Sequence, residues 1–246
     1  EPLLRKDLES LMGRAVQNGF QVSFNTNGWL VTEQRAQAIC DAGVSIAYVS
    51  LDGIEPATVD HSRGRKGSFD KALQAINLFD AKPNPRVVIA AILHAENASE
   101  MPRLLEFVRD RGLQVVVQPL YQSFGENEYD PQWYQEAPLW PRSTSALNDI
   151  DAAVDLLTAD RMRGGAVCNE VGQLQAFKKH FRGPDVDNGH QCRAGHTDIS
   201  IDAKGNIRMC YFLEPVATVF DMHPLPLVWD GVTTLRRRWE VSRCDR

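Results

Sequence analysis

The chain has 246 residues, of which 43% are hydrophobic and 24% charged, a composition typical of a globular protein and not of a disordered or fibrous one. Its net charge of −5 excludes the broad basic surface that would attract nucleic acid or anionic lipid, and no apolar run approaches the roughly 20 residues that span a bilayer. We therefore expect a cytoplasmic protein that binds neither nucleic acid nor membrane, and we interpret both ends as cuts within a longer chain.

Helical and strand-like patterns alternate through the first half of the sequence. Apolar residues at helical spacing indicate helices, and short runs rich in β-branched residues indicate strands. In chain order, helices are expected near 8–15, 33–42, 69–81 and 98–111, and the strands that follow them are expected at Phe20–Phe24, Ser45–Leu51, Arg86–Leu93 and Gln114–Leu120.

Three of these strands, around Val49, Ile89 and Val116, are nearly continuous apolar runs. Parallel strands that are covered on both faces have this composition. The alternation of helix and strand therefore predicts an α/β fold, and it fits either an α/β barrel or an open doubly wound sheet.

The alternation breaks after Leu120. The next residues, 121–142, are rich in Pro, Glu and aromatic residues, and we expect either a substrate-contacting lid or a surface insertion. Helices near 144–158 and 170–181 follow, and then a β-hairpin that turns at Gly205. The expected parts are a core over 1–125, an insertion with a helix over 126–165, and a small hairpin-and-helix module over 166–246.

Polar residues follow the ends of the predicted strands, where parallel α/β folds build their sites. Asn, Thr and Ser there suit a ribose or an amino-acid headgroup, although Asn-Gly and Asp-Gly are also ordinary turn sequences. Arg63 lies in a loop before a helix that we expect Ser68 to cap, and it could grip a carboxylate with two hydrogen bonds. The strand-end candidates are Asn25, Thr26, Asn27, Gly28, Ser50, Asp52, Gly53, His94, Gln118 and Tyr121.

Five cysteines are spread thinly along the chain, which argues against a secreted disulfide framework. Cys192 precedes the hairpin and Cys210 closes it, so two thiolates are expected at one end of a small sheet, and Cys244 supplies a third. Soft thiolates suit zinc or an iron–sulfur cluster, and spacing alone leaves both open together with unrelated cysteines. Cys168 is a fourth candidate ligand, whereas Cys40 is expected in the core.

Several motifs, in this order and spacing, resemble those of radical S-adenosylmethionine (SAM) enzymes, and the resemblance covers nearly the whole chain. The final hairpin resembles the SPASM or shorter "twitch" extension, which binds auxiliary [4Fe-4S] clusters in that family. The matching segments are Glu1-Pro2, Asn25-Thr26-Asn27-Gly28, Ser50-Leu51-Asp52-Gly53, the His61–Phe69 loop, and Cys192 with Gly205-x4-Cys210.

The resemblance implies a partial (β/α)6 TIM-like barrel whose first strands are missing here. The family's Cys-x3-Cys-x2-Cys motif, which ligates the catalytic [4Fe-4S] cluster, is not in this sequence and would lie before Glu1. By resemblance, Glu1 belongs to a motif that meets the amino group of SAM. The other implied cofactor-binding residues are Asn25 or Thr26, Ser50, Asp52 and Arg63, and the implied auxiliary cluster ligands are Cys192, Cys210 and Cys244.

The implied chemistry of the parent enzyme is reductive cleavage of SAM to a 5′-deoxyadenosyl radical, which abstracts hydrogen from a peptide, protein or cofactor-precursor substrate. The implied electron donor is a flavodoxin or a ferredoxin. Two other functions stay open: a zinc-stabilised α/β binding module, and a (β/α) barrel enzyme that acts on a small metabolite. Because the catalytic ligands are absent, we expect this fragment to be inactive alone.

Overall fold

The computed structural model of the chain describes residues 1–122, 130–184 and 192–244. It divides into two compact units. Unit 1 consists of Glu1–Leu120 and Ala137–Arg182, and unit 2 of Tyr121–Glu136 and Gly183–Arg246. The division that we predicted, with boundaries after 125 and 165, remains a prediction.

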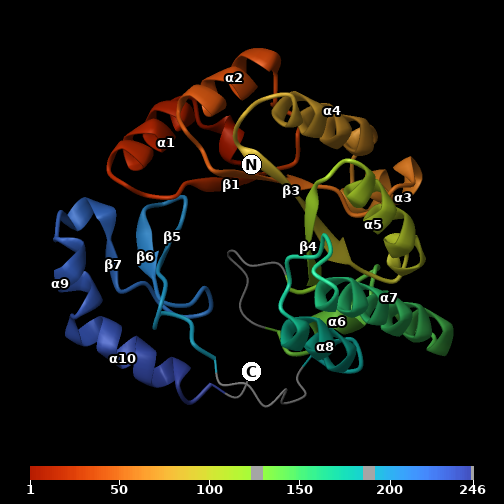
Figure 1. Cartoon of the computed structure of the whole chain (residues 1–246). Coiled ribbons are helices and arrows are strands. Elements are labelled where there is room, and N and C mark those ends of the chain that lie inside the picture. The colour runs from red at the N-terminus through yellow and green to blue at the C-terminus, as the bar shows by residue number, and fades with distance from the viewer. Residues whose placement is uncertain (123–129, 185–191, 245–246) are drawn as a thin grey trace. The chain divides into compact units, whose positions relative to one another are not determined.

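Unit 1 contains a parallel sheet with strand order β1-β2-β3-β4, so each strand pairs with the next in sequence (Figure 1). This arrangement places all four carboxyl ends along one edge. The strands are β1 (Ser23–Thr26), β2 (Ile46–Ser50), β3 (Arg86–Leu93) and β4 (Gln114–Pro119). The helices are η1 (Pro2–Leu4), α1 (Leu8–Gln17), α2 (Glu33–Asp41), α3 (Pro56–Ser62), α4 (Ser68–Asp80), η2 (Ala98–Glu100), α5 (Met101–Asp110), α7 (Thr144–Met162) and α8 (Val171–His180).

A further segment continues the sheet beside β4. Val115 and Val167 form a parallel bridge, in which Val115 N donates to Ala166 O at 3.0 Å and Cys168 N donates to Val115 O at 2.8 Å. Asn169 extends this pairing with its side chain, because its amide accepts from Val117 N and donates to Val117 O, both at 2.8 Å. Four named strands and this segment therefore run in parallel.

The core of unit 1 lies between the sheet and its helices. Alternate residues of the strands, such as Val49, Ile89 and Val117, are fully buried, and so are Ile76 and Phe79 of α4. Figure 1 shows α2 and α4 on the same side of the sheet. In β1 and β2, the residues between these buried positions, including Ser50, lie on the opposite face of the sheet and are at least partly exposed. One face is therefore packed and the other is available to a ligand.

The predicted helix–strand order is confirmed, with two differences. β1 begins at Ser23 and not at Phe20, because Phe20 N donates to Ala15 O at 3.1 Å and thereby belongs to the end of α1. Helix α3 was not predicted, since seven residues are too few to show a clear helical period.

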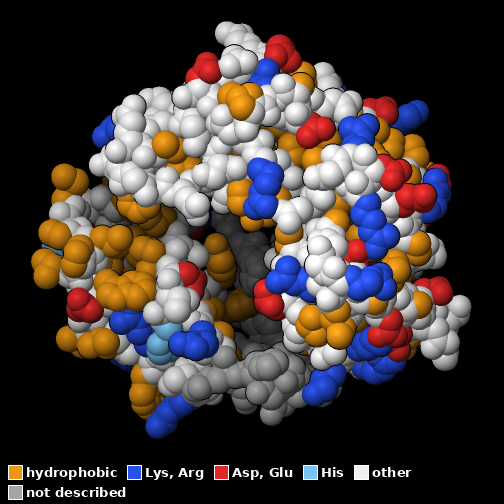
Figure 2. Space-filling view, viewed as in Figure 1, with side chains coloured by type: hydrophobic (Ala, Val, Ile, Leu, Met, Phe, Trp, Pro, Cys, Tyr) orange, Lys and Arg blue, Asp and Glu red, His pale blue; other side chains and the backbone are white. Residues whose placement is uncertain are grey.

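Unit 2 is built around a small antiparallel sheet with order β5-β6-β7. Asp202 accepts hydrogen bonds from Lys204 N and Asn206 N, both at 2.9 Å, and Gly205 takes a φ of +82°, so the predicted hairpin is confirmed. The elements of unit 2 are α6 (Trp133–Glu136), β5 (Ser200–Ile201), β6 (Asn206–Arg208), β7 (Ala217–Thr218), η3 (Val219–Asp221), α9 (Leu225–Trp229) and α10 (Val232–Val241). Figure 2 shows hydrophobic side chains gathered over β7, α9 and α10.

Among the described residues, no helix is both long and apolar enough to cross a membrane. The α/β class that the sequence predicts is confirmed by the parallel sheet of unit 1 and its flanking helices.

Candidate functional site

Glu1 lies at the carboxyl end of β1. Its Oε1 accepts hydrogen bonds from Thr26 Oγ1 at 3.0 Å and Leu3 N at 3.2 Å, and its Oε2 accepts from Asn27 N at 2.8 Å. Thr26 is buried, and its hydroxyl oxygen also accepts from Gly28 N at 3.1 Å. The two predicted site residues Glu1 and Thr26 are therefore in direct contact, and they fix the start of the loop after β1.

Gly28 allows this loop to lie against α4. Its φ is +83°, and a Cβ at this position would come within 2.5 Å of the backbone oxygen of Lys71. Any other residue would push the loop and the helix apart. The glycine thus serves the close approach of two elements and not a turn alone.

A pocket of about 280 Å³ lies at the carboxyl ends of β1 and β2. It includes two predicted site residues, Ser50 and Arg63, and the strand-end candidate Asn27. A volume of this size is near the lower end of the range for small-molecule sites, so the pocket suits part of a larger ligand. The full lining is Asn27, Trp29, Ser50, Arg63, Arg65 and Ser68.

Asp52 anchors the wall of this pocket. Its side chain is 3% exposed, and its Oδ1 accepts from Ile92 N at 2.9 Å and from the Arg63 guanidinium at 2.5 Å, while its Oδ2 accepts from Ser62 Oγ at 2.9 Å. Arg63 Nε is buried and has no hydrogen-bond partner among the described residues. Asp52 therefore orients Arg63, whose buried Nε keeps an unused donor.

The loop after β2 is held by side chains from the next helix–strand unit. Asn97 Nδ2 donates to Asp52 O at 2.6 Å, and Glu100 Oε2 accepts from Ile54 N at 2.8 Å and Glu55 N at 2.9 Å. A Cβ on Gly53 would come within 2.5 Å of Glu100 Oε2. Gly53 leaves room for the Glu100 carboxylate, and no pattern in the sequence points to this partner.

The loop that carries Arg63 ends at the start of α4. We expected Ser68 to cap this helix, but Ser68 is its first residue and its hydroxyl donates to Arg65 O at 2.8 Å. The carboxylate of Asp60 takes the capping role, since it accepts from Gly67 N at 2.7 Å and Phe69 N at 3.1 Å. These two hydrogen bonds lower the pKa of Asp60 below its ordinary value.

His94 follows β3 and is 1% exposed. Its Nδ1 accepts from Glu96 N at 3.3 Å, while its Nε2 is buried without a partner among the described residues. Burial lowers the pKa of His94, against the opposing effect of the nearby Asp52 carboxylate. The imidazole is therefore held neutral beside the site.

Asn25 is exposed at the third position of β1 and does not line the pocket. Trp29 and Arg65, which do line it, were not among the predicted site residues. The Arg65 guanidinium lies 3.4 Å from the centre of the Trp29 ring. Trp29 follows the Asn25–Gly28 segment and Arg65 lies within the His61–Phe69 loop, but only the fold brings the two side chains together.

The predicted metal ligands Cys192, Cys210 and Cys244 lie in unit 2 and form no disulfide. The described part of the chain contains no group of three His, Cys, Asp or Glu side chains placed to hold a metal ion. The role of the three cysteines therefore remains a prediction. Cys168 lies beside β4, where burial raises the pKa of its thiol, and Cys40 is half-buried on α2, where its thiol donates to Asn84 Oδ1 at 3.4 Å.

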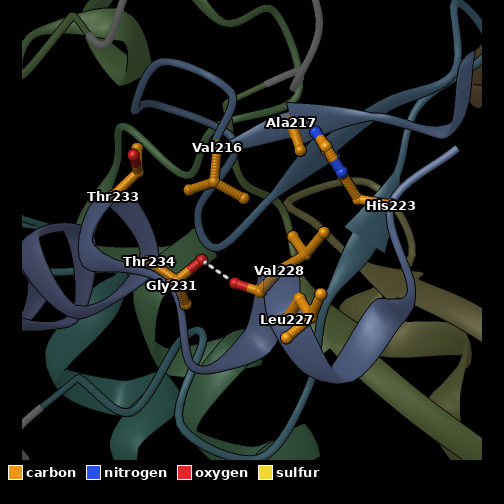
Figure 3. Close-up of a pocket in the computed structure, with 8 residues that line it drawn as sticks. All are labelled: Val216, Ala217, His223, Leu227, Val228, Gly231, Thr233 and Thr234. Carbon is orange, nitrogen blue, oxygen red and sulfur yellow. Dashed lines mark hydrogen bonds between the residues drawn. The ribbon is translucent and has the colours of Figure 1, made fainter. Parts of the chain in front are cut away.

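Unit 2 contains a second pocket, of about 340 Å³, between β7 and the helices α9 and α10 (Figure 3). Its walls are mostly apolar, and the hydroxyl of Thr234 donates to Val228 O at 2.6 Å and so offers no proton to a ligand. The lining residues are Val216, Ala217, His223, Leu227, Val228, Gly231, Thr233 and Thr234.

Comparison with known proteins identifies the family. The model of the radical SAM superfamily matches residues 1–108. The AdoMet-dependent heme synthase of Methanosarcina barkeri (strain Fusaro / DSM 804) is 30% identical over 250 residues, which cover 96% of this chain and 68% of that relative. The chain belongs to the radical SAM superfamily. The zinc-stabilised binding module is accordingly not favoured.

The chain is also similar to a second relative over less than half of its length, and to a solved structure over nearly all of it. The Fe-coproporphyrin III synthase of the same strain is 32% identical over 110 residues, which are 45% of the radical SAM chain and 27% of the relative. The crystal structure of Streptococcus suis SuiB bound to precursor peptide SuiA aligns with a TM-score of 0.68 at 14% identity, covering 97% of this chain and 54% of SuiB. This likeness confirms the barrel-like α/β fold.

The radical SAM chain therefore spans about a quarter of one relative and about half of SuiB. The family uses SAM together with a [4Fe-4S] cluster, and the Cys-x3-Cys-x2-Cys ligand motif does not occur within residues 1–246. Glu1, Thr26, Ser50 and Arg63 lie in or beside the strand-end site, whereas ligands for the catalytic cluster are not among the residues of this chain.

Proposed function

We propose that the edge formed by β1 and β2 binds SAM, and that the parent enzyme uses the bound SAM for radical chemistry on its substrate. The observation that carries this proposal is the shared pocket of Ser50 and Arg63 beside the Glu1–Thr26 contact. These residues come from four segments, namely the N-cap of η1, the ends of β1 and β2, and the C-cap of α3, and they supply a carboxylate, two hydroxyls and a guanidinium at one strand edge.

These groups match the parts of SAM. Arg63 suits the cofactor carboxylate, because its unpaired Nε can still donate while Asp52 holds the rest of the guanidinium in place. The carboxylate of Glu1 suits the amino group, and Ser50 Oγ suits a ribose hydroxyl. Asn25, which is exposed at β1, remains a candidate for a portion of the cofactor outside the pocket.

When bound with its cluster, SAM supplies a 5′-deoxyadenosyl radical that removes hydrogen from a substrate. The residues of this chain contribute binding and orientation, since hydrogen bonds from several loops restrict the cofactor to one position. Because the cluster motif is not in this sequence, no step of that chemistry is assigned to residues of the chain.

We propose a peptide or a cofactor precursor as the substrate class. The names of the similar proteins support this range, because SuiB was crystallised with a precursor peptide and two relatives are named as synthases of heme and of Fe-coproporphyrin III. A flavodoxin or a ferredoxin is the proposed electron donor. We also propose a cytoplasmic location, which the free thiols of the described cysteines favour.

Cys192, Cys210 and Cys244 are proposed ligands of an auxiliary [4Fe-4S] cluster. Gly195 supports a shared location for the first two, because a Cβ on Gly195 would come within 2.7 Å of Met209, the neighbour of Cys210. Arg238 of α10 donates to Gly195 O at 2.7 Å and thereby ties the helix before Cys244 to the same loop.

Calorimetric titration of SAM into anaerobically reconstituted full-length protein tests the proposed function. We expect Ser50→Ala and Arg63→Gln each to weaken SAM binding by about tenfold or more, since each removes a hydrogen bond to the cofactor. Arg111→Gln is the matched control, because Arg111 is also a helix-adjacent arginine of unit 1 but lies outside the pocket. Unchanged SAM affinity in both site variants would refute the proposed binding site.

A further inference from the structure

Arg65 is fixed in the pocket by both its backbone and its side chain. Its N donates to Asp60 O at 3.0 Å, and its O accepts from Ser68 Oγ at 2.8 Å. Its guanidinium carbon lies over the Trp29 ring, 3.4 Å from the ring centre. An arginine stacked in this way keeps the N–H groups of its edge available and loses little freedom when it binds a ligand.

The two arginines of the pocket differ in their charge balance. Arg63 is paired with the buried carboxylate of Asp52 at 2.5 Å. Arg65 is exposed, and no carboxylate of the described residues lies within ion-pair distance of it. The pocket therefore contains one compensated cation and one cation that lacks an anionic partner.

The neighbouring polar groups do not supply that partner. Asn27 Oδ1 accepts from Trp29 N at 3.1 Å, so this side-chain oxygen is already used within its own loop. The nearest capping carboxylate, Asp60, is occupied by the backbone of Gly67 and Phe69. A guanidinium held on an aromatic face binds carboxylate through two parallel hydrogen bonds, so the missing partner is best supplied by a ligand.

We propose that Arg65, stacked on Trp29, binds a carboxylate group of the substrate. This inference rests on the proposed function, in which Arg63 takes the single carboxylate of SAM. A second guanidinium at the same pocket offers a site for a second anion, and in this proposal the substrate supplies it. The substrate class is thereby narrowed to carboxylate-bearing compounds: a peptide with an acidic side chain or a precursor with a carboxylate arm.

The test compares glutarate with its uncharged analogue glutaramide on the cluster-loaded full-length protein, with SAM at saturation. Binding is followed by ligand-observed NMR for the wild-type protein and for Arg65→Gln, Arg65→Lys and Arg111→Gln. Arg111 is the matched control because its guanidinium also stacks on an aromatic ring, that of Phe107, outside the pocket. Affinity for SAM is measured in parallel for every variant.

We expect glutarate to bind the wild-type protein and Arg111→Gln equally and glutaramide to bind neither. Arg65→Gln should weaken glutarate binding by about tenfold, and Arg65→Lys by less, because lysine keeps the positive charge but cannot donate two parallel hydrogen bonds to a carboxylate. The SAM affinity of both Arg65 variants should stay within about twofold of the wild-type affinity. The inference is overturned if glutaramide competes as well as glutarate, if Arg65→Gln binds glutarate normally, or if Arg65→Gln weakens SAM binding instead.

The two proposals fail in different ways. If the wild-type protein binds no SAM, the proposed function is refuted, whereas glutarate binding measured without SAM, and compared between wild type and Arg65→Gln, still decides the role of Arg65 as an anion-binding residue. If SAM binds and glutarate does not, only the inference about Arg65 is refuted.

Discussion

His94 is a titratable side chain that is buried away from water. The unfolded chain takes up a proton on this imidazole near its ordinary pKa of about 6.5, whereas burial lowers the pKa in the folded protein. Below that pH the unfolded state therefore binds more protons than the folded state, and stability falls as pH falls. His180 contributes in the same direction, because burial also lowers its pKa.

We expect the free energy of unfolding to decrease as pH falls from about 7.5 to 5.5, by at most roughly 1.4 kcal/mol per pH unit for each of the two histidines. His94→Asn should reduce this slope, since asparagine can still accept from Glu96 N but does not titrate. Urea denaturation at several pH values measures the slope. An identical slope in wild type and variant would show that His94 does not titrate on unfolding.

For single residues, the sequence predicted which side chains follow the strands but not which groups those side chains contact. Ser50 and Arg63 share a pocket because parallel strands end at one edge, a rule that can be applied without coordinates. The pairing of Arg63 with Asp52 and the stacking of Arg65 on Trp29 depend on the paths of loops. Such contacts arise from tertiary packing, and no local pattern records them.

Among the elements, α7 is joined to its surroundings by a buried carboxylate. The side chain of Asp160 is 2% exposed, and it accepts from Arg109 of α5 at 2.5 Å and from Val167 N at 2.9 Å. Burial by itself raises the pKa of Asp160, but the hydrogen bonds from Arg109 and Val167 outweigh it and leave the pKa lowered. This stabilisation is present above a pH of about 3.9 and is lost as pH falls further.

Asp160→Asn should destabilise the protein by about 2 kcal/mol, because an amide cannot accept from Arg109 and Val167 with two oxygens. Asp155→Asn on the same helix is the matched control. The side chain of Asp155 is 71% exposed in its pair with Lys178, so its replacement should change stability by less than about 0.5 kcal/mol. Equal effects of the two substitutions in chemical denaturation would contradict the assigned role of Asp160.

The element boundaries show why periodicity predicts some segments better than others. β3 has the predicted bounds, Arg86–Leu93, because a continuous β-branched run can hardly be shifted without exposing apolar residues. β1 was predicted too early, although Asn18-Gly19 marks a helix end: Gly19 takes a φ of +83° and Phe20 completes the last turn. Phe20, at 67% exposure, is apolar without being in the core.

Across the whole molecule, the hydrophobic core is unevenly distributed. Among the described residues, the largest fully buried side chains all belong to unit 1, including Phe79 and Phe181, whereas the buried apolar residues of unit 2 are Ile207, Met209 and Val241. Small units with little core usually need a metal or disulfides for stability. This unevenness favours the predicted metal role of the unit 2 cysteines.

Hydrogen exchange measured by mass spectrometry should therefore show strong protection in β3 and β4 and weak protection across 192–244 in metal-free protein. Anaerobic reconstitution with iron and sulfide should raise protection in 192–244 and leave β3 unchanged. Cys210→Ser should abolish that increase, with Cys40→Ser as a control on α2. A metal-independent exchange pattern in unit 2 would remove the support for an auxiliary cluster.

Asn169 has a consequence for how the sheet ends. Its carboxamide presents the same N–H and C=O groups to Val117 as a peptide unit would, so the edge of β4 is satisfied without another residue of strand backbone. The main chain is thereby released to turn into α8 at Val171. An aspartate at 169 would place a second acceptor opposite the carbonyl of Val117. Replacing this one amide nitrogen by an oxygen would therefore break the pairing at this edge of the sheet.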